Sequence, residues 1–86
     1  MNKLEFLHWL QDYESSLGMW KVNIINEEFS QYTVGCFKDY TTGEYKVYKN
    51  DEQGHKIRLT TKEQDKAYGK LKNLVMFIVE NNRGYI

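Results

Sequence analysis

The chain has 86 residues, and its twelve basic side chains balance its twelve acidic ones. This length predicts one domain over residues 1–86. The neutral charge argues against a dedicated nucleic-acid binder, which usually carries a clear positive excess. The single cysteine, Cys36, excludes an internal disulfide. Residues 1–10 are too polar for a signal peptide, and the longest apolar run, 74–79, is too short to cross a bilayer. We therefore expect a cytoplasmic protein without membrane contact.

Residues 2–17 are predicted to form a helix. Asn2 can cap its N-terminus, and Glu5 stands at the position that completes a capping box. Gly18 suits a left-handed C-terminal cap. The apolar side chains recur at spacings of three and four and predict one buried face. They are Phe6, Trp9, Leu10, Tyr13 and Leu17.

Four strands are predicted next, over residues 20–26, 31–40, 44–50 and 56–60. Alternation of apolar and polar residues is typical of half-buried strands. In the second strand it turns Val34 and Cys36 inward and leaves Phe37 outward. In the fourth strand it turns Ile57 and Leu59 inward. Gly43 and Gly54 are placed to close the two hairpins between strands two, three and four.

A second helix is predicted from the cap Thr60, with Glu63 three residues further on. Its core stripe consists of Ala67, Leu71, Leu74, Val75 and Ile78. Residues 74–79 also suit a strand, because Val, Phe and Ile have high strand propensity. The predicted fold class is α+β, a two-layer sandwich in the order helix, four-stranded antiparallel meander, helix. One sheet face is then buried by the helices and the other is open.

No residue pattern in the chain points to catalysis. Cys36 lies within a strand and is expected to be a buried structural thiol. Neither His8 nor His55 has a partner at the spacing of a metal site. Asp51 and Glu52 lie in a hairpin turn, which is normally solvated. There is no glycine-rich phosphate loop. We expect a protein that is not an enzyme and needs neither cofactor nor metal.

Two surfaces remain as candidates for binding. The open sheet face combines basic side chains with aromatic rings and could stack bases or contact phosphates, or could simply be a solvated face. Its residues are Lys21, Phe37, Lys46, Tyr48, Lys56 and Arg58. The outer stripe of the second helix is either a partner surface or a solvated lysine face. Its residues are Lys62, Lys66, Lys70, Asn73 and Phe77.

Residues 45–54, 61–63 and 67–68 combine an aromatic strand, an acidic Asp-Glu-x-Gly turn and a helix opened by Thr-x-Glu. This pattern resembles small immunity proteins of bacterial polymorphic toxin systems, and the immunity protein 59 family is the most similar. The resemblance spans residues 40–74. It implies a non-enzymatic cytosolic antidote that binds and blocks a cognate toxin. Independently of the resemblance, we expect a monomer or weak homodimer. We expect the partner to contact Phe37, Tyr48, Asp51, Glu52 and Arg58.

The same segment also resembles the three-stranded arm-DNA-binding domain of tyrosine recombinases, which places a sheet face in the major groove. Nucleic acid is therefore the alternative partner. Its contacts would be Lys21, Lys46, Tyr48, Lys56 and Arg58. The acidic residues around the same hairpins, such as Asp39 and Glu44, oppose that assignment.

Overall fold

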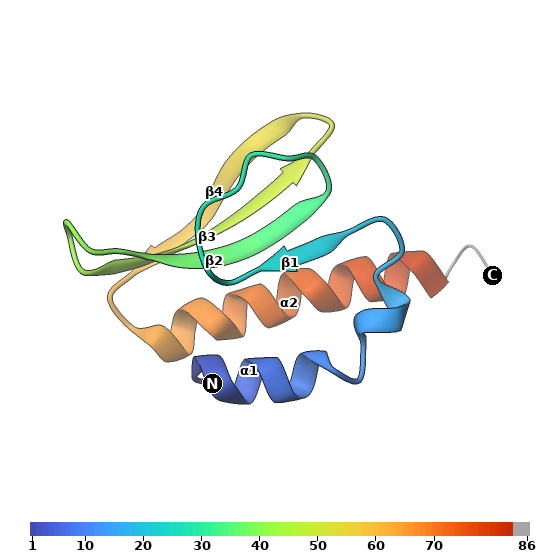
Figure 1. The fold of residues 1–86 in the computed structure, drawn as a ribbon, viewed down its shortest axis with the longest axis horizontal. Coiled ribbons are helices and arrows are strands. Elements are labelled where there is room, and N and C mark those ends of the chain that lie inside the picture. The colour runs from blue at the N-terminus through green and yellow to red at the C-terminus, as the bar shows by residue number, and fades with distance from the viewer. Residues whose placement is uncertain (84–86) are drawn as a thin grey trace.

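Two helices lie on the same side of a four-stranded sheet (Figure 1). The structure is a computed structural model, and it describes residues 1–83. In chain order the elements are α1 (Lys3–Leu10), a short 3₁₀ helix η1 (Glu14–Ser16), β1 (Lys21–Asn23), β2 (Thr33–Asp39), β3 (Glu44–Asp51), β4 (Gly54–Thr61) and α2 (Gln64–Arg83). The predicted α+β class is confirmed.

The first helix begins as predicted but ends early. The Asn2 side chain accepts from the Glu5 backbone N–H at 2.8 Å, and the Glu5 carboxylate accepts from the Asn2 N–H at 2.9 Å. Beyond Leu10 the backbone closes tighter i→i+3 bonds, and the chain turns into η1. The predicted apolar stripe is still maintained, because Phe6, Leu10 and Leu17 are all buried.

The second helix is one continuous element from Gln64 to Arg83, so residues 74–79 are helical. The five residues of the predicted core stripe are buried, and the helix packs on β2, β3 and β4. The predicted cap at Thr60 is wrong, because β4 continues to Thr61. The Thr61 hydroxyl instead accepts from the Glu63 backbone N–H at 3.1 Å, just before the helix.

The sheet is mixed, and the prediction of an antiparallel meander is wrong for its first strand. β2, β3 and β4 pair as antiparallel hairpins, whereas β1 runs parallel to β2. The physical reason lies at the end of β1. The Asn23 side-chain oxygen accepts from the backbone N–H groups of Ile25 and Asn26, at 2.9 and 3.1 Å, and turns the chain out of the sheet.

Residues 24–32, which we call the crossover segment, then run over the sheet and re-enter it in the same direction as β1 (Figure 1). They lie on the face turned away from the helices, which we call the outer face. The prediction of an open sheet face is therefore wrong where the crossover segment covers it.

A β-bulge corrects the predicted orientation of the fourth strand. Val47 pairs with Leu59 and Tyr48 pairs with Ile57, so Arg58 is an extra residue without a partner in the register. Ile57 therefore shares the outer face with Tyr48 and is 43% exposed, whereas it was predicted to point inward with Leu59.

No helix in residues 1–83 is long and apolar enough to span a bilayer.

Candidate functional site

The crossover segment is fastened to the outer face by the buried side chain of Tyr48. The Tyr48 hydroxyl donates to the Asn26 carbonyl at 3.0 Å and accepts from the Glu28 backbone N–H at 3.2 Å. Burial raises the pKa of Tyr48 to about 12, so the hydroxyl keeps its proton at neutral pH. The ring lies opposite Gly35, where any side chain would collide with the Tyr48 hydroxyl and the Asn23 carbonyl.

Asn50 makes a second anchor, one pairing step beyond Tyr48 on the same face. Its Nδ2 donates to the carbonyls of Glu28 and Ser30, at 2.7 and 2.9 Å. Because Nδ2 is used in this way, the Asn50 oxygen faces His55 and accepts from Nδ1 at 2.6 Å. The other ring nitrogen of His55 lies 2.8 Å from the Glu27 carboxylate, which forms an ion pair when the ring is protonated.

An ion pair joins the crossover segment to β1. Lys21 binds the carboxylate of Glu28, and Asn23 Nδ2 donates to the same carboxylate at 2.9 Å. Hydrogen bonding by Lys21, with a smaller contribution from Asn23, lowers the pKa of Glu28 to about 2. The Glu28 carboxylate is therefore charged at neutral pH and remains charged well below its ordinary pKa of 4.5.

The segment ends at Tyr32, whose backbone is left-handed with φ of 59°. A non-glycine residue in this region is uncommon and is strained. The surrounding structure holds it in place. Its N–H donates to the Asn50 carbonyl at 2.8 Å, its carbonyl accepts from the Lys21 N–H at 3.0 Å, and its hydroxyl donates to Glu52 at 3.2 Å. The hydrogen bond to Glu52 raises the pKa of Tyr32.

The fastened segment exposes large apolar side chains. Ile25 is 83% and Phe29 is 69% exposed. From Phe29 a row of rings crosses the outer face through His55 and Tyr48 to Phe37, with centroid distances of 4.4, 5.2 and 6.0 Å. The exposed apolar groups therefore sit on a firmly packed aromatic base.

The residues predicted to contact a protein partner are divided among three places. Phe37 and Tyr48 are neighbours on the outer face, as expected, but the prediction that Tyr48 is exposed is wrong, because the crossover segment covers it completely. Arg58 is exposed at the bulge. Asp51 is the last residue of β3 and accepts from the Gln53 N–H, and Glu52 follows it in the turn and accepts from Tyr32.

The residues predicted to contact nucleic acid form no shared basic face. Tyr48 is buried and cannot contact nucleic acid. Lys21 is paired with Glu28, and Lys46 lies 3.2 Å from the Asp39 carboxylate. Lys56 and Arg58 remain exposed on β4. The prediction that Lys56 shares the outer face is wrong, because Lys56 pairs with Lys49, and Lys49 pairs with the buried Val34 on the face turned toward the helices.

On α2, the alternative surface, Lys66 is paired with Glu63 at 2.7 Å, and Phe77 is 55% exposed. The Lys49 ammonium lies 4.8 Å from the centre of the Phe77 ring. At one end of this stripe, the charge of Lys66 is thus neutralised by Glu63. At the other end, the Phe77 ring already contacts the Lys49 ammonium.

The crossover segment was not identified from the sequence, since residues 26–30 resemble an ordinary polar connection. Gly35 could have indicated it, because a glycine within a strand marks a close approach by other groups.

Among residues 1–83, no cluster of His, Cys, Asp and Glu is arranged to hold a metal ion. Cys36 is buried, and burial raises the pKa of its thiol to about 11.

Comparisons with protein-family models, with curated proteins and with solved structures found no match.

Proposed function

We propose that this chain is a non-enzymatic binding protein of the immunity type, which captures a cognate toxin through its crossover segment. The observation that carries the proposal is the exposure of Ile25 and Phe29 on a segment fixed by partly buried hydrogen bonds from the buried residues Tyr48 and Asn50. Exposed apolar side chains of this size are typical anchors of protein interfaces.

Pre-organisation favours binding through this segment. A mobile loop loses conformational entropy when it binds, at a cost of about 1–2 kcal/mol for each residue whose backbone becomes fixed. Here Tyr48 and Asn50 hold the backbone of the segment in place before any partner arrives. More of the contact energy of Ile25 and Phe29 is then available for affinity.

Acidic groups beside the segment support an antidote role. Glu27 lies on the crossover segment, and Asp51 and Glu52 lie on the adjoining turn, to which Tyr32 is bonded. Such a cluster attracts a basic partner and raises the rate of association. This agrees with the resemblance to immunity proteins, whose partners are toxins.

The test uses the product of the gene next to the one that encodes this chain. We expect that product to arrest growth when expressed alone, growth to recover when this chain is co-expressed, and the two proteins to co-purify at a fixed ratio. Recovery without complex formation would contradict capture as the mechanism. Absence of both toxicity and binding would remove the antidote proposal.

A second candidate is binding to nucleic acid through the edge of β4. It is favoured by the exposure of Lys56 and Arg58 on that strand. Duplex DNA should then bind at low salt, and its affinity should fall steeply as the salt concentration rises. The double variant Lys56→Ala, Arg58→Ala should bind DNA poorly. An absence of any gel shift at low salt would exclude this candidate.

A further inference from the structure

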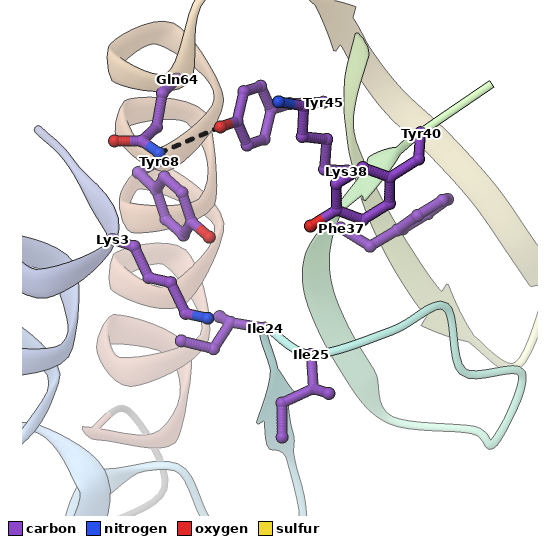
Figure 2. A pocket seen from close by; sticks show the side chains of 9 residues that line it. All are labelled: Lys3, Ile24, Ile25, Phe37, Lys38, Tyr40, Tyr45, Gln64 and Tyr68. Atoms are coloured by element: carbon purple, nitrogen blue, oxygen red, sulfur yellow. Dashed lines mark hydrogen bonds between the residues drawn. The ribbon is translucent and has the colours of Figure 1, made fainter. Parts of the chain in front are cut away.

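A cavity opens where the start of α2, strand β2 and the beginning of the crossover segment meet (Figure 2). Its volume is about 240 Å³. An apolar cavity of about 150 Å³ can hold benzene, so this one has room for one aromatic ring and a small substituent. Ile24, Phe37 and Tyr68 contribute apolar surface to its wall.

The charged side chains that line the cavity are all cationic. Lys3 reaches toward it from α1, and Lys38 from β2 (Figure 2). Within the described part of the chain, no acidic residue lines the cavity, and two acids of neighbouring elements are paired elsewhere, Asp39 with Lys46 and Asp65 with the N-terminal ammonium. Among residues 1–83, neither Lys3 nor Lys38 forms an ion pair. The cavity therefore presents positive charge that nothing within it neutralises.

Two aromatic rings hold one of these cations in position. The Lys38 ammonium lies 5.6 Å from the ring centres of both Tyr40 and Tyr45. The Tyr45 hydroxyl accepts from Gln64 Nε2 at 3.0 Å, as the dashed line in Figure 2 marks. Because that bond uses a lone pair of the oxygen, the Tyr45 proton is left to donate to a ligand.

We propose that this cavity binds an aromatic carboxylate. The ring of the ligand packs against Ile24 and Phe37, and its carboxylate accepts from the Lys38 ammonium and the Tyr45 hydroxyl. Charge-assisted hydrogen bonds of this kind are stronger than neutral ones and set the preference for an acid over its amide. The site does not depend on a protein partner, so its test is independent of the proposed capture of a toxin.

The experiment is a titration of the isotope-labelled chain with benzoate, followed by NMR. We expect saturable shifts at Ile24, Phe37 and Gln64, with a dissociation constant in roughly the millimolar range for a ligand of this size. Benzamide, which has the same shape but no charge, should bind at least about fivefold more weakly. Equal binding of benzamide, or shifts that never saturate, would overturn the proposal.

A matched pair of variants locates the site. Lys38→Gln should weaken benzoate binding by at least about fivefold, and Lys56→Gln, which removes an exposed lysine on β4, should leave it unchanged. The unliganded spectra show that each variant is folded. Equal affinity in wild type and Lys38→Gln would place benzoate elsewhere and refute the assignment. N-acetylphenylalanine distinguishes the natural source: if it binds more tightly than benzoate, the ligand is a peptide C-terminus, and the opposite order identifies a free acid.

Discussion

The hydroxyl of Tyr48, on the third strand, donates a hydrogen bond to the carbonyl of Asn26, 3.0 Å away on the crossover segment. The two residues belong to different parts of the chain, and their contact buries a ring that alternation alone would leave in solvent. This contact converts a polar connection into a fixed element of the surface.

Removing that hydroxyl should release the crossover segment. We expect Tyr48→Phe to lower the free energy of unfolding by about 1–2 kcal/mol, because the partly buried Asn26 carbonyl and Glu28 N–H lose their partner. Hydrogen exchange at Glu28 should also become faster. Urea denaturation and exchange NMR measure these effects.

The matched control is Tyr40→Phe. Tyr40 is 87% exposed, and its hydroxyl makes no hydrogen bond with residues 1–83, so stability should change by less than about 0.5 kcal/mol. If both variants behaved alike, Tyr48 would not be the anchor of the segment.

Gly35 and Gly69 should respond oppositely to the same substitution. A methyl group at Gly35 would collide with the Tyr48 hydroxyl and the Asn23 carbonyl, whereas one at Gly69 meets nothing within 4 Å. We expect Gly35→Ala to destabilise the protein by roughly 3 kcal/mol or more, as overpacking and the lost contacts combine. Gly69→Ala should stabilise α2 by about 0.5–1 kcal/mol. Thermal melts would refute the close packing at Gly35 if both alanines were tolerated.

Much of the fold could be predicted because it depends on local chemistry. The capping box of Asn2 and Glu5, the turn glycine Gly43 and the apolar stripe of α2 all act within a few residues. The mixed sheet could not be predicted in this way. The parallel pairing of β1 is fixed by contacts such as that of Asn50 with Ser30, twenty residues apart in sequence.

The same difference between local and long-range contacts explains which features of the candidate site could be predicted. Phe37 and Tyr48 were correctly placed on one face by their alternation. Their exposure was not predictable, because it depends on where residues 24–32 lie. The bulge at Arg58 shifted Ile57 outward for a similar reason, since an extra residue breaks the strict alternation on which the prediction rested.

The ion pair of Lys21 and Glu28 gives a pH dependence of defined sign. The folded-state pKa of Glu28 is about 2, below its ordinary value of 4.5. The charged form therefore stabilises the fold above pH 4.5, and this contribution is lost as the pH falls through the folded pKa. The difference in melting temperature between wild type and Glu28→Gln should be constant above about pH 5.5 and shrink toward pH 2.

Comparison with Glu28→Gln cancels other titrating groups, such as Asp39, whose pKa is also lowered. A difference that did not change with pH would show that the Glu28 charge contributes nothing.

Asn50 should tolerate no change of hydrogen-bonding character. Asn50→Asp keeps the shape of the side chain but turns a carboxylate oxygen toward the carbonyls of Glu28 and Ser30. Because this group is 1% exposed, we expect a loss of about 2–3 kcal/mol at neutral pH, measured by denaturation. Wild-type stability in this variant would mean that the amide does not fasten the segment.

The proposed capture of a partner by the crossover segment is tested by calorimetry with the product of the neighbouring gene. Ile25→Asp and Phe29→Asp should each weaken binding by about tenfold or more without changing the melting temperature. Leu4→Asp, which alters a residue that is 76% exposed on α1, should bind like wild type. Undiminished affinity in both crossover variants, or an equal loss in Leu4→Asp, would contradict the account.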